Sequence, residues 1–203
     1  MCGINGIVDL SLDRHSQISE KLFLMNQDIR HRGPDASKIF EDGCVGLGHV
    51  RLSILDVSSS ADQPMSSFSG RYNIVFNGEI YNFKELAEIL RKQFSITLKT
   101  SGDTEVLVNL IECLGIDKAL ELIEGMFSFA LYDKQLKRIY LCRDRFGEKP
   151  LFWFCKENKL YFSSELGPLT KQLKKSLTIN YESLGFFLKK SYVPSGQSIY
   201  NEV

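Results

Sequence analysis

Several features are missing from these 203 residues, and each absence narrows what the protein can be. Lys plus Arg and Asp plus Glu number 25 each, so the chain has no excess of the basic residues that bind nucleic acids. No apolar run approaches the roughly 20 residues that a membrane-spanning helix needs. The opening residues, MCGINGIVDL, lack the basic segment followed by an apolar one that marks a secretory signal. We therefore expect no nucleic-acid partner and no membrane partner.

Disulfide, metal-binding and nucleotide-binding patterns are also absent. The five cysteines are odd in number and form no CxxC pair, which favours reduced thiols in a cytoplasmic protein. None of the motifs GxxxxGKS, GxxxxGKT, GxGxxG and HExxH occurs, and His15 and His49 have no metal-ligand spacing with the cysteines. We assign both histidines to the surface and to structure, and we expect no cofactor and no metal in this chain.

The apolar periodicity predicts a layered fold. β-type runs bounded by turn residues cover residues 2–10, 45–52, 71–76, 127–132, 138–142, 151–154 and 160–162. Helical spacing of apolar residues predicts helices at residues 18–29, 83–90, 106–114 and 117–123. Strands followed by helices and then by strands again predict an α+β fold. The run FSFALY, apolar on both faces, predicts a sheet buried between other layers.

The chain divides into a long unit and a short tail. Residues 1–175 contain no repeat and no low-complexity tract, and they are predicted to form one compact unit. Residues 176–203 end in YVPSGQSIYNEV, which shows no closing element. We interpret this last stretch as a linker or as the start of a second domain.

Cys2 is the first candidate catalytic residue. Removal of the initiator Met, which requires a small second residue, would leave a thiol and a free α-amine on Cys2. An α-amine titrates near about 7.7–8.0 and a thiol near about 8.5, so one residue could supply both a nucleophile and its general base. The alternative is a small apolar side chain at the start of a buried strand. Taken alone, Cys2 does not decide between these interpretations.

Asn77 and Gly78 are a candidate pair of hydrogen-bond donors. Asn-Gly between two β-type runs, as in RYNIVFNGEIYNF, predicts a hairpin turn. The functional alternative is that the Asn77 amide and the Gly78 backbone N–H point at one oxyanion, as acyl transfer requires. Both can hold, because a tight turn is a good way to aim a backbone N–H.

Arg51 and Asp103 form a candidate clamp for a free amino acid. Arg51 follows small and apolar residues, where its charge needs a partner, and a guanidinium matches a carboxylate in a bidentate fork. The alternative for Arg51 is a snorkelling edge residue. Asp103, in TSGDTEVLV, is expected either to cap a helix or to hold an ammonium group. Of the remaining polar segments, HRGPD is expected to be a turn and RDRFGEKP a solvated loop with internal ion pairs.

The order of the motifs carries more information than any one of them. MCGI, HRGPD, RLSILD, NGEIYN, SGDTE and RDRFGEKPL follow one another along the chain. Together they resemble the N-terminal glutaminase domain of asparagine synthetase (glutamine-hydrolysing), a class II glutamine amidotransferase, and the resemblance covers residues 1 to about 200. It implies an N-terminal nucleophile hydrolase fold, with two antiparallel sheets sandwiched between helix layers.

The resemblance also implies a role for each candidate residue. Cys2 would be the nucleophile with its own α-amine as base, and Asn77 and Gly78 would form the oxyanion hole. The other residues would bind the carboxylate and ammonium ends of glutamine, three of them through backbone groups. They are Arg51, Glu79 and Asp103, and, for the backbone groups, Leu52, Ile54 and Leu55.

The implied reaction is glutamine hydrolysis to glutamate and ammonia through a γ-glutamyl thioester. The ammonia would pass to an ATP-using synthetase domain of the same polypeptide that aminates adenylated aspartate, and ATP and Mg²⁺ are implied for that domain only. Its SerGlyGly-type pyrophosphate loop is not among these residues, so we expect a truncated or a stand-alone piece, with homodimerisation left open. The alternatives are a catalytically silent docking or dimerisation module and the glutaminase half of an amidotransferase with another acceptor.

Overall fold

The computed structural model describes residues 2–11, 17–173 and 177–203, so His15 lies outside the described residues. Its strands are β1 (Gly3–Asp9), β2 (Ala36–Asp42), β3 (Val45–Arg51), β4 (Met65–Ser66), β5 (Tyr72–Ile80), β6 (Gly125–Asp133), β7 (Arg138–Arg143), β8 (Phe152–Lys156) and β9 (Lys159–Ser163). Its α-helices are α1 (Ile18–Asp28), α2 (Phe83–Phe94), α3 (Asp103–Leu114), α4 (Ile116–Leu122), α5 (Leu166–Leu173) and α6 (Tyr181–Lys190).

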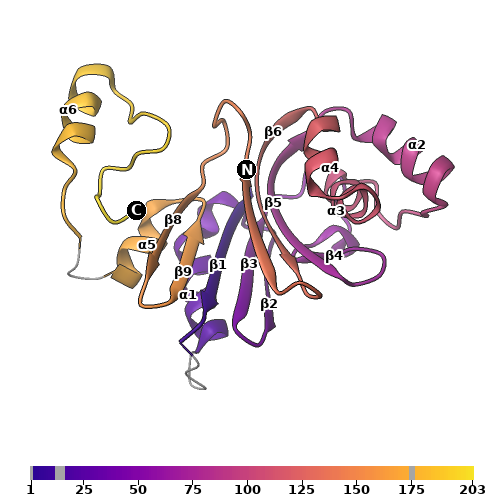
Figure 1. Ribbon diagram of the computed structural model, residues 1–203, viewed down its shortest axis with the longest axis horizontal. Coiled ribbons are helices and arrows are strands. Elements are labelled where there is room, and N and C mark those ends of the chain that lie inside the picture. The colour runs from indigo at the N-terminus through magenta and orange to yellow at the C-terminus, as the bar shows by residue number, and fades with distance from the viewer. Residues whose placement is uncertain (1, 12–16, 174–176) are drawn as a thin grey trace.

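Two antiparallel sheets packed face to face form the centre of the fold. One sheet has the strand order β2-β3-β1-β9-β8 and the other β4-β5-β6-β7. Helices α1 and α5 cover the outer face of the first sheet, and α2, α3 and α4 cover the outer face of the second (Figure 1). The predicted α+β fold, with two antiparallel sheets between helix layers, is confirmed.

Apolar side chains alternate between two faces along the central strands. The layer between the sheets contains Ile4, Val8, Val45, Leu47, Val75, Ala130, Tyr132 and Phe162. The intervening residues point outward, so that Ile7 lies in the layer under α1 and Phe129 in the layer under α3. Because successive side chains of a strand face opposite ways, both faces of β1 and β6 are buried, as the run FSFALY predicts.

Strand β5 is longer than its predicted extent, and this corrects the prediction for Asn77 and Gly78. The strand continues to Ile80, with Asn77 paired to Ser128 and Gly78 to Phe127 of β6, so the predicted hairpin turn is wrong. The neighbouring strand β6 runs back to Gly125 and offers a partner to each of these residues. The pairing is close at Gly78, where a Cβ would lie 2.3 Å from the backbone oxygen of Met126. Glycine is therefore required here for close approach and not for a turn.

The elements β2, β4, α5 and α6 have no counterpart among the predicted ones. In α6, the side chain of Asn180 accepts a hydrogen bond from the Ser183 N–H at 3.0 Å and so caps the helix start. Figure 1 shows α6 apart from the two sheets, with the following segment returning toward α5 and β8. Leu177 and Val203 pack against the apolar layer under α1 and α5. The division at residue 175 stays a prediction.

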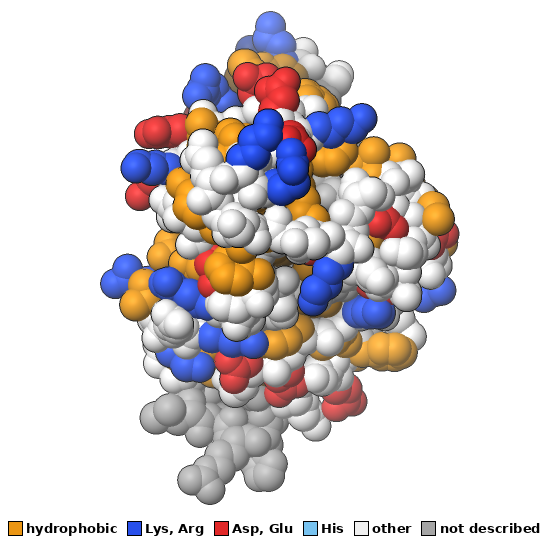
Figure 2. Space-filling model, turned by 90° about the vertical axis from the view of Figure 1, so that its right-hand side faces the viewer, with side chains coloured by type: hydrophobic (Ala, Val, Ile, Leu, Met, Phe, Trp, Pro, Cys, Tyr) orange, Lys and Arg blue, Asp and Glu red, His pale blue; other side chains and the backbone are white. Residues whose placement is uncertain are grey.

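The surface carries charges of both signs. On the face seen from the side of α2 and α4, Lys and Arg are interspersed with Asp and Glu (Figure 2). This mixture agrees with the formal net charge of zero. Within the described ranges, none of the helices combines the length and the apolar character needed to cross a membrane.

Candidate active site

The nine predicted site residues all line one cavity of about 140 Å³. It lies where the start of the chain and the turn after β3 meet β5 and the start of α3. The predicted residues are Cys2, Arg51, Leu52, Ile54, Leu55, Asn77, Gly78, Glu79 and Asp103. Residues outside the predicted set also line it, among them Asp56, Gln63, Thr104 and Lys149. Segments distant in sequence therefore meet at one place.

The strand register brings Cys2 to this cavity. Gly3 of β1 pairs with Val50 of β3, so the antiparallel register places Cys2 beside Arg51 and Leu52. The Leu52 N–H donates to Cys2 Sγ at 3.5 Å, and the thiol lies 3.7 Å from the Leu52 carbonyl oxygen that accepts from it. Arg32 Nε donates to the Cys2 carbonyl oxygen at 3.0 Å. Arg32 thus holds the main chain of Cys2, and the backbone of Leu52 holds its sulfur.

The environment of Cys2 raises the pKa of its thiol. Burial raises the pKa above its usual value, and the hydrogen bond from the Leu52 N–H offsets only part of this effect. A thiol of raised pKa is largely protonated near neutral pH. If Cys2 is a nucleophile, it therefore needs a base that removes its proton as it reacts.

Asn77 offers an unused donor to the cavity. Its side chain is 1% exposed, and its Nδ2 has no hydrogen-bond partner among the described residues. A buried amide donor without a partner costs about 1–3 kcal/mol. Of the buried side-chain atoms left unpaired in the described ranges, Asn77 Nδ2 is the one whose residue lines the cavity. The arrangement is that of a donor kept for a ligand atom.

The edge of β5 supplies a second donor beside it. Phe127 exchanges hydrogen bonds with Asp144 on its far side, so its partner Gly78 directs its own N–H away from β6. On that same edge, the Phe76 N–H donates to Gln63 Oε1 at 2.6 Å and the Ile80 N–H to Asp103 Oδ2 at 2.9 Å. The Gly78 N–H lies between these two occupied positions, at the cavity.

Asp103 does not cap α3. The helix begins at Asp103, and its N-cap position is Gly102, whose residue type offers no side-chain cap. The Asp103 carboxylate accepts from the Ile80 N–H and, at 3.4 Å, from the Thr104 hydroxyl. Burial raises the pKa of Asp103, and the Ile80 N–H offsets part of this. The helix-cap interpretation is therefore wrong, and a buried carboxylate at the cavity wall is suited to an ammonium group.

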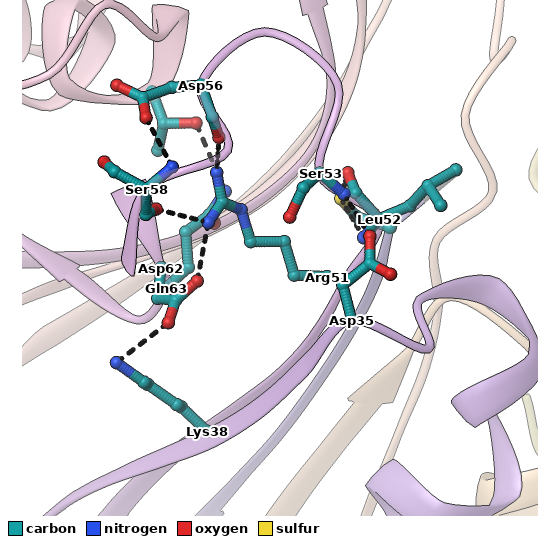
Figure 3. A network of polar contacts seen from close by, with 11 residues as sticks. Asp35, Lys38, Arg51, Leu52, Ser53, Asp56, Ser58, Asp62 and Gln63 are labelled. Carbon is teal, nitrogen blue, oxygen red and sulfur yellow. Dashed lines mark hydrogen bonds and ion pairs between the residues drawn. The ribbon is translucent and has the colours of Figure 1, made fainter. Parts of the chain in front are cut away.

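Arg51 is paired within the protein. Its guanidinium donates to Asp62 Oδ1 at 2.6 Å, to the Ser58 carbonyl oxygen at 2.7 Å and to the Asp56 carbonyl oxygen (Figure 3). Lys38 also pairs with Asp62, at 3.0 Å. These bonds hold the turn of residues 52–62 against β3. They show that the charge has a partner in the unliganded protein, and the predicted contact of Arg51 with a substrate carboxylate stays a prediction.

The other predicted residues lie at the cavity rim. Leu52 contributes its N–H and carbonyl oxygen to Cys2, as described above. Ile54 and Leu55, in the same turn, have exposed side chains, as does Glu79 on β5. Ser53 is tied back by its N–H, which donates to Asp35 Oδ2 at 2.7 Å (Figure 3).

The segment RDRFGEKP is a loop whose residues Arg143, Arg145, Phe146 and Glu148 are exposed, as predicted, but it is organised by backbone hydrogen bonds to a buried carboxylate and not by the predicted ion pairs. Asp144 is buried and accepts from the backbone N–H groups of Phe127, Phe146, Glu148 and Lys149. Burial raises the pKa of Asp144, but these N–H groups outweigh it and the net pKa is lowered. The ordered loop carries Lys149 to the cavity wall, where it is 6% exposed.

The sequence analysis does not single out Gln63 and Lys149, which line the cavity, or Arg32 and Asp62, which bond Cys2 and Arg51. Arg32 lies in HRGPD, which predicts a turn, and Lys149 lies in RDRFGEKP, which predicts a loop. The only local signal at either residue is the mixture of charged residues and glycine. Asp62 and Gln63 lie in a segment whose composition is that of an ordinary surface turn. Their contacts with Arg51 and with β5 depend on how the turn folds back, which no local pattern encodes.

Comparisons with known proteins agree on the kind of domain. A family described as "Glutamine amidotransferase domain" matches residues 1–203. Asparagine synthetase (glutamine-hydrolyzing) 2 of Bacillus subtilis is 40% identical over 83% of this chain, and asparagine synthetase (glutamine-hydrolyzing) 1 of that organism is 36% identical over 98%. The chain spans only 22% and 31% of the length of these relatives.

A solved structure agrees with the fold. Glutamine phosphoribosylpyrophosphate amidotransferase from Bacillus subtilis superposes with a TM-score of 0.69 at 21% identity. The match covers 83% of this chain and 43% of that one. At this identity the likeness concerns the fold, and it agrees with two antiparallel sheets between helix layers.

Proposed function

The chain belongs to the class II glutamine amidotransferase family, and from this premise we propose that it hydrolyses glutamine to glutamate and ammonia through a γ-glutamyl thioester on Cys2. The observation that carries the proposal is the cavity itself. It brings Cys2, the unpaired Asn77 amide and the Gly78 N–H together with the buried carboxylate of Asp103. These are the parts that acyl transfer from a free amino acid needs.

The proposed reaction proceeds in two halves. Cys2 Sγ attacks the side-chain amide carbon of glutamine, and the α-amine of Cys2, freed by removal of the initiator Met, takes the thiol proton and passes it to the departing ammonia. The carbonyl oxygen becomes an oxyanion that accepts from Asn77 Nδ2 and from the Gly78 N–H. A water molecule, deprotonated by the same α-amine, then attacks the thioester, and the released thiolate takes the proton back.

Binding of the amino-acid end of glutamine follows from the charges at the cavity. The Asp103 carboxylate would pair with the ammonium group, and Glu79 of β5, at the rim of the cavity, would assist it. Arg51 would bind the α-carboxylate, and for this its guanidinium would exchange part of its present bonds to the 52–62 turn. The backbone of Leu52, Ile54 and Leu55 would line the path of the substrate.

The destination of the ammonia is the second part of the proposal. Relatives of this chain are asparagine synthetases several times its matched length, which supports delivery to an ATP-dependent synthetase domain that makes asparagine from aspartate. ATP and Mg²⁺ would be bound by that domain. A relative of Gibberella zeae named amidase chry2, 34% identical over 82% of this chain, favours keeping other acceptors as a second candidate.

The direct test is to incubate untagged protein, with Met1 removal checked by mass spectrometry, with glutamine. Glutamate and ammonia should appear in equal amounts. A processed protein that binds glutamine without releasing either product would instead support a silent docking module.

Asn77→Ala is expected to lower kcat for glutamine hydrolysis by about 10²–10³-fold with little change in KM, because an oxyanion donor acts mainly in the transition state. Steady-state kinetics measure both constants. Asn73→Ala is the matched control: Asn73 lies on the same face of β5 and is also buried with an unpaired Nδ2, but it does not line the cavity. An effect of Asn77→Ala on KM alone would contradict the oxyanion role.

Asp103→Asn is expected to raise KM for glutamine by on the order of 10²-fold and to change kcat little, since losing one partner of a buried charge pair costs about 2–5 kcal/mol. The same variant should be more stable than the unliganded wild type at neutral pH. Burial raises the pKa of Asp103 in the folded state above its value in the unfolded state. The free energy of unfolding of the wild type therefore falls as the pH rises from the unfolded-state pKa through the folded-state pKa, and it stays lower above that pH. The Asn side chain carries no charge, so the variant does not lose this stability at neutral pH.

Thermal unfolding at neutral pH and near pH ~4 checks the sign, because the gain in Tm should be larger at neutral pH. Glu105→Gln is the control within the same helix turn. Its carboxylate accepts from the N–H groups of Lys99 and Thr100, so its loss should lower Tm. An Asp103→Asn protein with lowered Tm and unchanged KM would leave Asp103 a purely structural role.

A further inference from the structure

Both main-chain polar groups of Phe76, the residue before Asn77, are held by buried side chains. The Phe76 N–H donates to Gln63 Oε1 at 2.6 Å. The Phe76 carbonyl oxygen lies 3.2 Å from Nε2 of His49. That carbonyl belongs to the peptide unit that ends at Asn77, and the next unit carries the Gly78 N–H. Both proposed oxyanion donors therefore follow directly from the clamped residue.

His49 reaches Phe76 across the layer between the two sheets. It lies on β3 of the first sheet, is 1% exposed, and contacts β5 of the second. A carbonyl oxygen only accepts, so Nε2 must carry the proton and donate. Burial lowers the pKa of His49 to about 4, which keeps the ring neutral and this hydrogen bond uncharged near neutral pH. The bond is a fixed link between the strand that ends at Arg51 and the strand that carries Asn77.

Gln63 links Phe76 to the other end of the cavity. While its Oε1 accepts from Phe76, its Nε2 donates to the Thr104 hydroxyl at 3.2 Å. That hydroxyl in turn lies 3.4 Å from Asp103 Oδ1. Gln63 is 6% exposed, so both of its bonds lie in a desolvated environment where a lost partner is costly. The oxyanion side and the ammonium side of the cavity thus share one support.

We propose that His49 and Gln63 are positioning residues of the glutaminase reaction, which together fix the main chain at Phe76 and so aim the Asn77 amide and the Gly78 N–H at the oxyanion. The inference rests on the proposed function. Neither residue needs to touch the reacting atoms. A small rotation of the main chain at Phe76 would misdirect both donors at once, and displacement of a catalytic group by about 1 Å can cost about 10²-fold in rate.

The first test compares two substitutions of His49. His49→Leu replaces the donor with an apolar side chain of similar size. It should lower kcat by about 10–10²-fold with KM nearly unchanged. His49→Gln restores an N–H donor at comparable reach and should recover most of the lost kcat. This recovery separates positioning from bulk packing, since both variants alter the packing. The readouts are kcat and KM for glutamine and the Tm of each protein.

Gln63→Met is the independent arm, because it removes the acceptor of the Phe76 N–H without changing His49. It should lower kcat in the same way, and it keeps the test decisive if His49→Leu does not fold. Asn109→Ala is the control for stability: Asn109 is a buried residue outside the cavity lining, and its Oδ1 accepts from the Phe68 N–H at 2.8 Å. It should lower Tm and leave kcat unchanged.

The outcomes separate the two proposals. A wild-type protein that does not hydrolyse glutamine would overturn the proposed function itself. An active wild type whose His49→Leu and Gln63→Met variants keep full kcat would overturn the positioning role alone. So would a loss of kcat in Asn109→Ala equal to theirs, or no recovery in His49→Gln, because the effect would then reflect general destabilisation.

Discussion

A Cys2→Ala variant is expected to release no measurable glutamate from glutamine, a loss on the order of 10⁴-fold or more. The substitution removes the only group at the cavity proposed to form a covalent bond with the substrate. It also removes little volume, and the two contacts of the sulfur are weak hydrogen bonds to the Leu52 backbone at 3.5 and 3.7 Å. The oxyanion donors stay in place but have no tetrahedral intermediate to stabilise. We therefore expect an intact fold without turnover.

The measurement is product release over time, together with the Tm of the variant. Cys44→Ala is the matched control, since Cys44 is an exposed free cysteine outside the cavity lining and should retain full activity. A glutamine-like electrophile should add to the wild-type and Cys44→Ala proteins once per chain, and should not add to Cys2→Ala. Turnover by Cys2→Ala above a few per cent of wild type would refute the thioester mechanism.

Blocking the α-amine of Cys2 is expected to have an effect almost as large as removing the thiol. A retained Met1 or an N-terminal tag converts that amine into an amide, which takes up no proton near neutral pH. Burial raises the pKa of the thiol, so few molecules hold a thiolate without a base. General-base catalysis is worth about 10²–10⁴-fold, and we expect a loss in that range.

The surroundings of Cys2 offer no evident substitute for the amine. The two histidines in the described part of the chain, His31 and His49, do not line the cavity. His31 is exposed and pairs with Glu165 at 2.8 Å, and His49 is committed to Phe76. A cysteine hydrolase that relied on a histidine would tolerate a short extension that leaves its pocket open.

The experiment compares an N-terminally tagged protein before and after removal of the tag down to Cys2. Each sample is checked by mass spectrometry and assayed for glutamate release at the same concentration. Activity should appear only after Cys2 is exposed. A C-terminally tagged protein that has lost Met1 serves as the control and should match the cleaved sample. Equal rates before and after cleavage would rule out the α-amine as base.

The order of the motifs and the apolar pattern of the strands predict a large part of the fold and of the candidate site. The pattern of apolar residues predicts seven of the strands in their order, and the four helices at 18–123, because burial on one or both faces leaves a direct trace in residue spacing. The motifs name nine residues that the fold gathers at one cavity. The catalytic and binding roles of these residues stay predictions, and the variants proposed above test them.

The local interpretations failed where a distant segment decided the outcome. Asn77-Gly78 has the composition of a turn, but β6 continues beside it and holds it as strand. Asp103 stands where a helix cap would, yet its carboxylate turns to the Ile80 N–H of a neighbouring strand. RDRFGEKP is a largely exposed loop, as predicted, yet Asp144 within it is buried and accepts from four backbone N–H groups in place of the predicted ion pairs.

The sequence by itself determined the alternating faces, the order of most strands and helices along the chain and which residue types are available for chemistry, since these follow from periodicity and side-chain character. Only the tertiary structure decided which polar groups are already paired and which are left for a ligand. Arg51 finds Asp62, and Phe76 finds His49 and Gln63, while Asn77 Nδ2 finds no partner in the described chain. The physical reason is that burial makes every hydrogen bond depend on where distant segments meet, and local spacing does not contain that information.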